Sequence, residues 1–187
     1  MTDMTAADLP IIERRRIEAE ILKPVYEALV ARFGEAVARD VLTEAVRASA
    51  IAQGRAFADA AGGKTDLDGF ADLLPRWTAG GALEIAIKHR DPGRFEFDVT
   101  RCRYAEMYRA MGLGAIGDIL SCNRDGTFCE GYDDRIKLQR TQTIMGGASH
   151  CDFRYSFSAR AAAAHQPSRA SRVGVAAASA ADKTPER

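Results

Sequence analysis

The sequence predicts an α+β domain in which N-terminal helices cover one face of a four-stranded antiparallel sheet made of two hairpins. Two patterns of hydrophobic residues carry this prediction. Hydrophobic residues recur every three or four positions up to Trp77, which is the period of a helix with one buried face. From residue 82 onward they alternate with polar residues, which is the period of a half-buried strand. The chain has 187 residues, enough for one well-buried core.

Glycines divide the helical part into three predicted helices. The first is expected at residues 7–33, and Pro24 in its middle is expected to kink or split it. The second is expected at 35–61. A short third helix is expected at 66–77, because Asp66, or Thr65 before it, is a good N-cap residue.

Two hairpins complete the predicted fold. The turn of the first is Asp91-Pro92-Gly93, where Pro presets φ and Gly tolerates positive φ. The second hairpin turns at Gly146-Gly147, and more helix is expected between the hairpins. The four strands are expected at 82–88, 95–100, 136–141 and 151–157, and the two helices at 103–111 and 115–121.

We predict one domain, at 1–158, in a cytoplasmic protein. Residues 159–187 are rich in Ala and Ser, so we expect a disordered tail that cannot offset its ordering entropy by burial. The N-terminus lacks the basic and apolar regions of a secretory signal, and no run approaches the ~18 apolar residues of a membrane span. We therefore expect no membrane partner, and free thiols at all four cysteines.

The charge pattern argues against nucleic acid as a partner. Lys plus Arg and Asp plus Glu both number 26, so there is no basic excess. The basic run at 13–16 is followed by Glu18 and Glu20, and we interpret it as a solvated helix face. No glycine-rich phosphate loop follows a predicted strand, so no organic cofactor is expected.

Cys102 is a candidate nucleophile because it is expected at the N-terminus of the helix at 103–111. There the helix dipole would lower the pKa of the thiol, and Glu106 would share its face of the helix. A small buried residue at a strand–helix junction is the alternative. Cys151 is a second candidate, since it opens the last strand on the same face as Phe153.

The segment 121–131 is dense in polar and reactive side chains and is expected to be a loop or a broken helix. It contains Cys122, Asp125, Cys129 and Glu130. Hydrolysis needs a nucleophile or an activated water together with a group that moves protons, and these residue types are suitable. The spacing of the two cysteines is longer than that of zinc-binding pairs, so no metal site is predicted.

Charged residues on the last two strands are candidates for substrate binding. Asp152 and Arg154 would lie on the face opposite Cys151, where they could pair with each other or bind a ligand, with His150 beside them. Arg140, expected in the middle of the strand at 136–141, could bind a carboxylate with two hydrogen bonds. A surface arginine is the alternative for Arg140.

Several of these segments resemble motifs of the L-2-amino-thiazoline-4-carboxylic acid hydrolase family. They are Val-Thr-Arg-Cys-Arg-Tyr-Ala-Glu-Met-Tyr at 99–108, the cysteine and aspartate stretch at 121–125, the segment 137–147 and Cys-Asp-Phe-Arg-Tyr at 151–155. The resemblance covers about residues 11–158. It implies a hydrolase that opens a small heterocyclic substrate, and Tyr104 in the first motif joins the substrate-binding candidates.

Several mechanisms remain open at this point. In one, a thiolate, with Cys151 slightly ahead of Cys102, attacks an amidine- or amide-like carbon, a carboxylate moves the proton and an arginine holds a substrate carboxylate. In another, a carboxylate activates water and the cysteines only line the pocket. A competing class is a small-ligand sensor that transforms nothing, and a redox-responsive protein is a third. A homo-oligomer is also left open.

Overall fold

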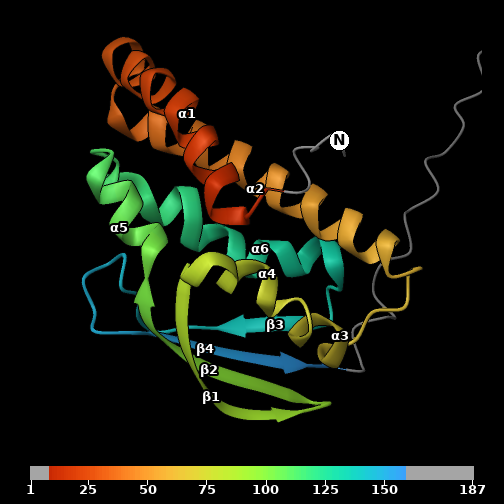
Figure 1. The fold of residues 1–187 in the computed structure, drawn as a ribbon. Helices are drawn as coiled ribbons and strands as arrows, with labels where there is room; N and C mark the ends of the chain where they lie inside the picture. Colours follow the sequence, from red (N-terminus) through yellow and green to blue (C-terminus); the bar gives the residue numbers. More distant parts are fainter. Residues whose placement is uncertain (1–8, 159–187) are drawn as a thin grey trace, which may run out of the picture.

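The computed structural model describes residues 9–158, and the predicted tail at 159–187 lies outside them. It confirms the α+β class, with helices on one face of a four-stranded antiparallel sheet (Figure 1). The elements are α1 (Ile11–Phe33), α2 (Glu35–Ala60), α3 (Leu67–Ala71), α4 (Leu74–Thr78), the 3₁₀ turn η1 (Ala79–Gly81), β1 (Leu83–Asp91), β2 (Arg94–Cys102), α5 (Arg103–Ala110), the 3₁₀ turn η2 (Gly114–Ile116), the π-helical turn η3 (Asp118–Cys122), α6 (Asn123–Tyr132), β3 (Ile136–Gln139) and β4 (Cys151–Phe157).

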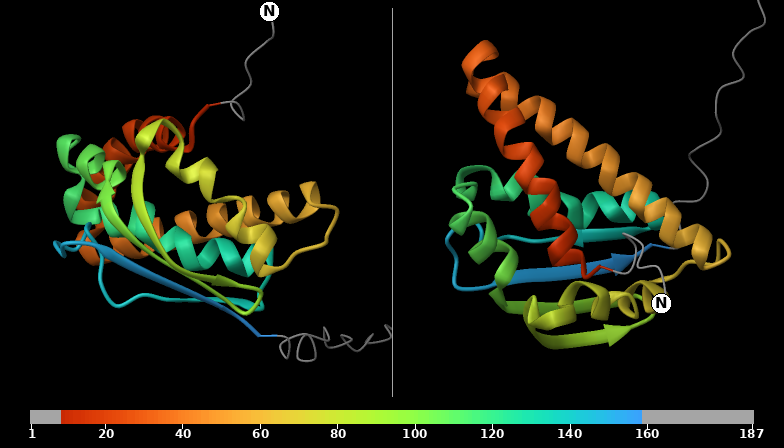
Figure 2. Two further views of the ribbon diagram at one scale, coloured as in Figure 1. Left: turned by 60° about the horizontal axis from the view of Figure 1, so that its bottom comes forward. Right: turned by 45° about the horizontal axis from the view of Figure 1, so that its top comes forward.

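Helices α1 and α2 form a long hairpin whose far end extends beyond the sheet (Figure 2). Gly34 makes the turn between them, at a φ of 84° that side chains disfavour. Of the two alternatives at Pro24, the split is wrong, because α1 runs through it as one helix. Pro24 is exposed, so water can satisfy the carbonyl that its ring leaves without a donor. No helix among residues 9–158 combines the length and apolarity needed to cross a membrane.

The sheet has the order β1-β2-β4-β3, so the strands of two hairpins meet at β2 and β4. Phe97 lies opposite Phe153 and Phe95 opposite Tyr155 in this central pair. The Phe97 and Phe153 rings stack with centroids 4.8 Å apart. These aromatic side chains share the inner face of the sheet, which faces the helices, and they belong to the hydrophobic core between the sheet and the helices.

Three shorter elements differ from the prediction. The helix expected at 66–77 is divided into α3 and α4, because Pro75 lies in the first turn of a new helix, where a missing N–H costs nothing. The helix expected at 115–121 is replaced by the turns η2 and η3. The segment 121–131, expected to be a loop or a broken helix, is mostly the regular helix α6.

Helix α6 lies between α2 and the sheet, and α2 crosses it at backbone contact (Figure 1). Gly54 of α2 faces the backbone of Phe128, and Gly131 of α6 faces the backbone carbonyl of Ile51. A Cβ atom at either glycine would overlap these backbone atoms. The two glycines therefore set the distance between the helices, and with it the height of the space below α2.

Candidate functional site

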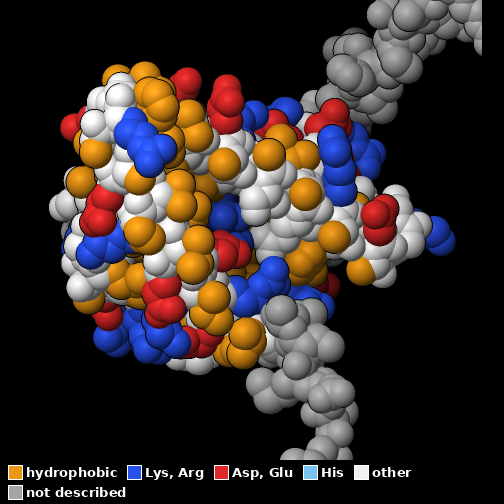
Figure 3. Space-filling model, turned by 90° about the horizontal axis from the view of Figure 1, so that it is seen from above, with side chains coloured by type: hydrophobic (Ala, Val, Ile, Leu, Met, Phe, Trp, Pro, Cys, Tyr) orange, Lys and Arg blue, Asp and Glu red, His pale blue; other side chains and the backbone are white. Residues whose placement is uncertain are grey.

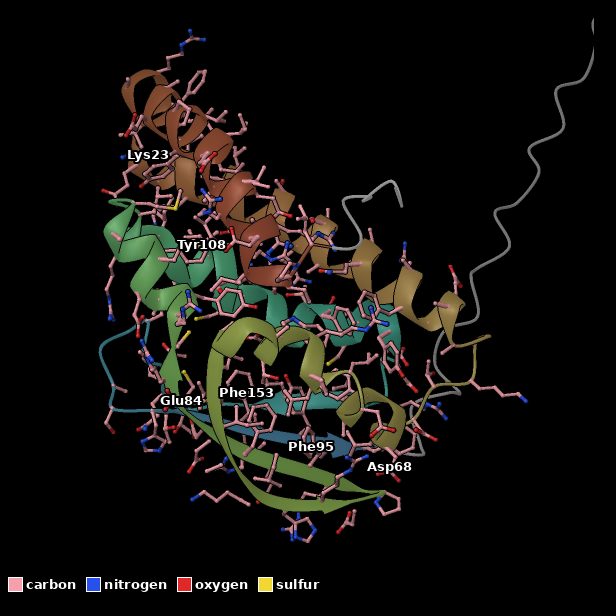
Figure 4. The ribbon with its side chains drawn as sticks, viewed as in Figure 1. Lys23, Asp68, Glu84, Phe95, Tyr108 and Phe153 are labelled. Carbon is pink, nitrogen blue, oxygen red and sulfur yellow. The ribbon has the colours of Figure 1, made fainter. Side chains whose placement is uncertain are left out.

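A cavity of about 80 Å³ lies between the inner face of the sheet and the helices. This volume is several times the ~10–15 Å³ that one water molecule needs, so the cavity has room for a group larger than a water molecule. Phe95 and Phe153 rise into this region from the sheet (Figure 4). The lining residues are Ile11, Arg15, Gln53, Phe70, Leu74, Trp77, Leu83, Phe95, Phe97, Tyr104, Ser121, Arg124, Asp125, Phe128, Phe153 and Tyr155.

Asp125 is the carboxylate of this cavity. It lies in the first turn of α6, and 28% of its side chain is accessible. Burial raises the pKa of its carboxyl above the ordinary value, although the neighbouring Arg140 guanidinium opposes this shift. A carboxyl group with a raised pKa can hold and release a proton closer to neutral pH than an ordinary aspartate can.

Arg140 holds Asp125 from outside the cavity. Its Nη1 donates to Asp125 Oδ2 at 2.5 Å, and its Nη2 donates to the carbonyl of Cys122 at 3.0 Å. The guanidinium also lies 4.9 Å from the centre of the Phe153 ring. The expected place of Arg140 within a strand is wrong: β3 ends at Gln139, and Arg140 turns toward α6. Two nitrogens of Arg140 thus bind protein groups, and the residue positions Asp125. Arg140 does not line this cavity but a separate, open pocket beside Cys122.

Two buried arginines that the sequence analysis missed line the cavity. Arg15 donates to both carboxylate oxygens of Glu18 at 2.8 Å and to Gln53 Oε1 at 2.8 Å. Arg124 donates to Glu18 Oε2 at 3.2 Å, to Ser49 Oγ and to the carbonyl of Leu120. Burial, and then the charge of Arg15, lower the pKa of Arg124 to about 10. One glutamate thus faces two arginines, which leaves an excess of positive charge at this end of the cavity.

The helical period contained a signal for both arginines. Arg15 lies three residues after Ile12 and four before Ala19, on the buried stripe of α1, and only 4% of it is exposed. The interpretation of 13–16 as a solvated face is therefore wrong for Arg15, because a helix turns each residue of a charged run to a different side. Arg124 likewise lies four residues from Leu120 and from Phe128, both buried.

Gln53 adds a buried hydrogen-bond donor to the same end of the cavity. Its Oε1 accepts from Arg15, while its Nε2 is buried and has no acceptor among the protein groups of residues 9–158. A buried donor without a partner costs about 1–3 kcal/mol. An acceptor atom on a bound ligand would remove this cost.

Cys129 and Cys151 are buried, and Cys102 and Cys122 are half-buried. No cysteine of residues 9–158 lines this cavity, although Cys122 lines a separate, open pocket together with Arg140. Cys102 does precede α5, as predicted, but the expected lowering of its pKa is wrong: burial raises it to about 11, although the N–H of Ala105 opposes the shift. Burial raises the pKa of Cys122 and of Cys129 to about 12. It also raises the pKa of Cys151, whose sulfur accepts from the N–H of Ile144 at 3.1 Å. Desolvation outweighs the helix dipole here.

These shifts predict slow thiol chemistry. At pH 8 the thiolate fraction of Cys102 is about 100-fold below that of a cysteine with the ordinary pKa of 9.0. We expect the native protein to react with an aromatic disulfide reagent at least about 10-fold more slowly than the protein unfolded in guanidinium. Absorbance at 412 nm follows the rate, and mass spectrometry identifies the site. Fast modification of a single cysteine in the native protein would contradict this prediction.

Glu106 and Glu130, both predicted proton donors, point to solvent. Glu106 pairs with Arg101 at 2.9 Å, and Glu130 pairs with Arg47 at 3.0 Å, on the protein surface. Neither side chain reaches the cavity. Tyr104, in contrast, does line it, and its hydroxyl donates to the carbonyl of Trp77 at 3.2 Å.

The candidates on the outer face of the sheet are engaged in other contacts. Arg154 donates to Asp98 at 2.8 Å. Asp152 accepts from the N–H groups of Thr141 and Gln142 at 3.0 and 2.9 Å. Of the two alternatives for Asp152 and Arg154, a mutual pair is therefore wrong, and ligand binding stays a prediction.

His150 lies beside Gln142 in the loop before β4. Together with Asp152 and Arg154 it is absent from the lining of the cavity. Within residues 9–158, no three His, Cys, Asp or Glu side chains gather so as to hold a metal ion.

Comparison with known proteins gives a family and distant structural likenesses. A family model described as L-2-amino-thiazoline-4-carboxylic acid hydrolase matches residues 14–155. No curated protein matches the chain. The phenol-responsive sensory domain of the transcription activator PoxR, crystallised with phenol, is 15% identical over 73% of each chain, with a TM-score of 0.47. A trafficking protein particle complex subunit 3 from Naegleria fowleri, covalently bound to palmitic acid, is 10% identical over 76% of this chain and 96% of its own, with a TM-score of 0.45. With TM-scores below 0.5, neither likeness bears on function.

Proposed function

Because the chain belongs to the L-2-amino-thiazoline-4-carboxylic acid hydrolase family, we propose that it hydrolyses a small, anionic, one-ring substrate inside the cavity, with Asp125 as its acid–base group. The observation that carries this proposal is the place of Asp125: a carboxyl group with a raised pKa, lining a cavity with largely aromatic walls and held by Arg140. The bond broken is a C–N or C–S bond of the ring.

Asp125 can serve both halves of such a reaction. In its protonated form it donates to a ring nitrogen, which makes the adjacent amidine-like carbon more electrophilic. A water molecule adds its oxygen to that carbon, and the carboxylate accepts the proton that the water loses. The adduct then collapses: its hydroxyl oxygen forms a C=O bond and the ring C–N or C–S bond breaks. Asp125 gives its proton to the leaving nitrogen or sulfur and accepts the proton of the hydroxyl group, so it ends protonated as it began. Arg140 keeps the carboxyl in place throughout.

This route is preferred here to attack by a cysteine. The pKa values of the thiols are raised, and the cavity lining has no cysteine among the described residues. A thiolate route would require both a lower pKa and a path from the sulfur to the substrate. Activation of water by a carboxylate requires neither.

The charge of the cavity favours an anionic substrate. Arg15 and Arg124 share one glutamate, so a substrate carboxylate would balance the remaining charge. The unpartnered Nε2 of Gln53 is a further donor beside them. The aromatic walls, among them Trp77 and Phe153, fit the faces of a flat ring.

The test measures binding and turnover separately. Trp77 is the chain's single tryptophan and lines the cavity, so its fluorescence reports ligand binding directly. We would titrate 2-amino-thiazoline-4-carboxylate and related one-ring heterocycles, and follow product by mass spectrometry. Binding with turnover would support the hydrolase. Neither signal with any compound would overturn the proposed site.

Binding without turnover would support a second candidate, a non-catalytic ligand-binding protein. The raised thiol pKa values favour this reading, since a buried aromatic cavity without an activated nucleophile is also what a ligand sensor needs.

Arg124→Gln is expected to weaken binding of a carboxylate ligand about 10- to 100-fold, the effect of losing a hydrogen bond to a charged group. Binding of the matching neutral carboxamide should change little, which separates lost charge recognition from a damaged cavity. Arg154→Gln, on the outer face of the sheet, serves as the matched control and should bind both ligands normally. Trp77 fluorescence measures all of these constants. Equal weakening of both ligands by Arg124→Gln would argue against an anion site.

A further inference from the structure

The far side of the α1–α2 hairpin exposes a set of large hydrophobic side chains. Six of the seven most exposed ones among residues 9–158 lie on these two helices, with 44–68% of each residue exposed. They are Ile17, Ile21, Val25, Phe33, Val37 and Val41. Those at 17, 21 and 25 lie four residues apart on α1, and those at 37 and 41 lie four residues apart on α2, so each set forms a stripe along its helix. Phe33 lies at the end of α1, beside the turn at Gly34.

The two stripes border an apolar groove between the helices. The groove has a volume of about 350 Å³, and Ile21 and Leu22 of α1 face Ala45 and Val46 of α2 across it. Ala45 continues the stripe of Val41 by one helical turn. Figure 3 views the molecule from above and shows hydrophobic side chains running across this face among separate charged groups.

We propose that this face binds the same face of a second copy of the chain, so that two helical hairpins form a homodimer. The exposed area suits such a contact. The six side chains present roughly 500 Å² of surface per copy, taking ~150–200 Å² for a fully exposed large side chain. Two copies would bury about 1,000 Å² or more, which is where specific protein interfaces begin. A patch of this size is also at the upper end of those found on monomers.

The charges of the hairpin fit a copy of itself better than a membrane. Helices α1 and α2 together carry eight basic and eight acidic residues, so the hairpin as a whole has no excess of positive charge to bind anionic lipid. Near the stripe of α1, Arg16 already pairs with Glu13 and Glu20, at 3.0 Å each. A neutral face with internally paired charges does not repel its own copy.

The shape of the face allows a two-fold arrangement. Ridges of side chains spaced four residues apart pack into the grooves of another helix surface. Each copy has both parts, a ridge through Ile21 and a groove beside it. In a two-fold interface each copy contributes the same patch, so both ridges and both grooves are used.

The test is the mass of the full chain in solution. Light scattering after gel filtration at about 50 μM is expected to give twice the 20.3 kDa of one chain. Ile21→Glu is expected to give a monomer, with a dissociation constant raised at least about 100-fold, because it places a charge at the centre of the interface. Ile87→Glu is the matched control: Ile87 is 51% exposed on β1, far from the hairpin in sequence, and its change should leave the dimer intact.

Circular dichroism would establish that both variants are folded, and Val41→Glu provides a second variant on α2 should Ile21→Glu unfold. Three results would overturn the proposal: a monomeric wild-type chain at 50 μM, a dimer that survives both Ile21→Glu and Val41→Glu, or a monomer that sediments with vesicles of phosphatidylcholine and phosphatidylglycerol. The last would assign the face to a membrane.

Discussion

Gly131→Ala is expected to lower the free energy of unfolding by about 3 kcal/mol or more, a large effect for one methyl group. The new Cβ would overlap the backbone carbonyl of Ile51 in α2. A backbone atom within a helix cannot rotate away as a side chain can, so the two helices would have to move apart. Chemical denaturation measures the loss, and Gly54→Ala, which meets the backbone of Phe128 from the other helix, should behave alike.

Gly126→Ala in the same helix is the matched control. There the Cβ would meet Leu138 at 3.8 Å, an ordinary contact. Because alanine favours a helix more than glycine does, this variant is expected to be as stable as the wild type or about 0.5–1 kcal/mol more stable. Equal stability of Gly131→Ala and Gly126→Ala would mean that α2 and α6 are farther apart than described.

Asp125→Asn is expected to lower kcat about 10²- to 10⁴-fold, the usual contribution of an acid–base group, on any compound that the wild type turns over. Asparagine has the same shape and can still accept from Arg140, so binding measured by Trp77 fluorescence should change much less than kcat. Glu106→Gln is the control, because Glu106 lies on the surface paired with Arg101. Full turnover by Asp125→Asn would remove this residue from the mechanism.

The pH profile gives an independent check on Asp125. Donation to the ring needs the protonated carboxyl, so the rate is expected to fall as pH rises through the pKa of Asp125. Burial raises that pKa, and the fall should therefore come at a higher pH than the ~3.9 of a free aspartate allows. Measuring kcat/KM from pH 4 to 9 would give the pH at which the rate falls. The residual activity of Asp125→Asn should not show this decrease.

The fold could be predicted because it depends on the spacing of hydrophobic residues within each helix and strand. The alternation through Phe95 and Phe97 and the three- and four-residue spacing in α1 and α2 each determine which side of an element is buried, and the antiparallel hairpins follow. Pro75 was the visible signal for the division of the third helix, but its place in a first turn depends on where α3 stops.

The site was predicted less well because it depends on contacts between distant segments. Asp125 was among the candidates for its chemistry, yet its pairing with Arg140 joins α6 to the end of β3. The prediction that Cys102 precedes a helix used only neighbouring residues and was correct, whereas the pKa of its thiol depends on burial by other segments. Arg15 was missed because a run of charges outweighed the helical period in the interpretation.

Arg124 lies between the cavity and the groove of the α1–α2 hairpin. It lines the cavity on one side and the groove between α1 and α2 on the other, so a single side chain is common to the two surfaces. Any coupling between two sites is reciprocal: the factor by which a ligand changes self-association equals the factor by which self-association changes ligand affinity. Ligand titrations at dilute and at concentrated protein would measure that one factor from both directions.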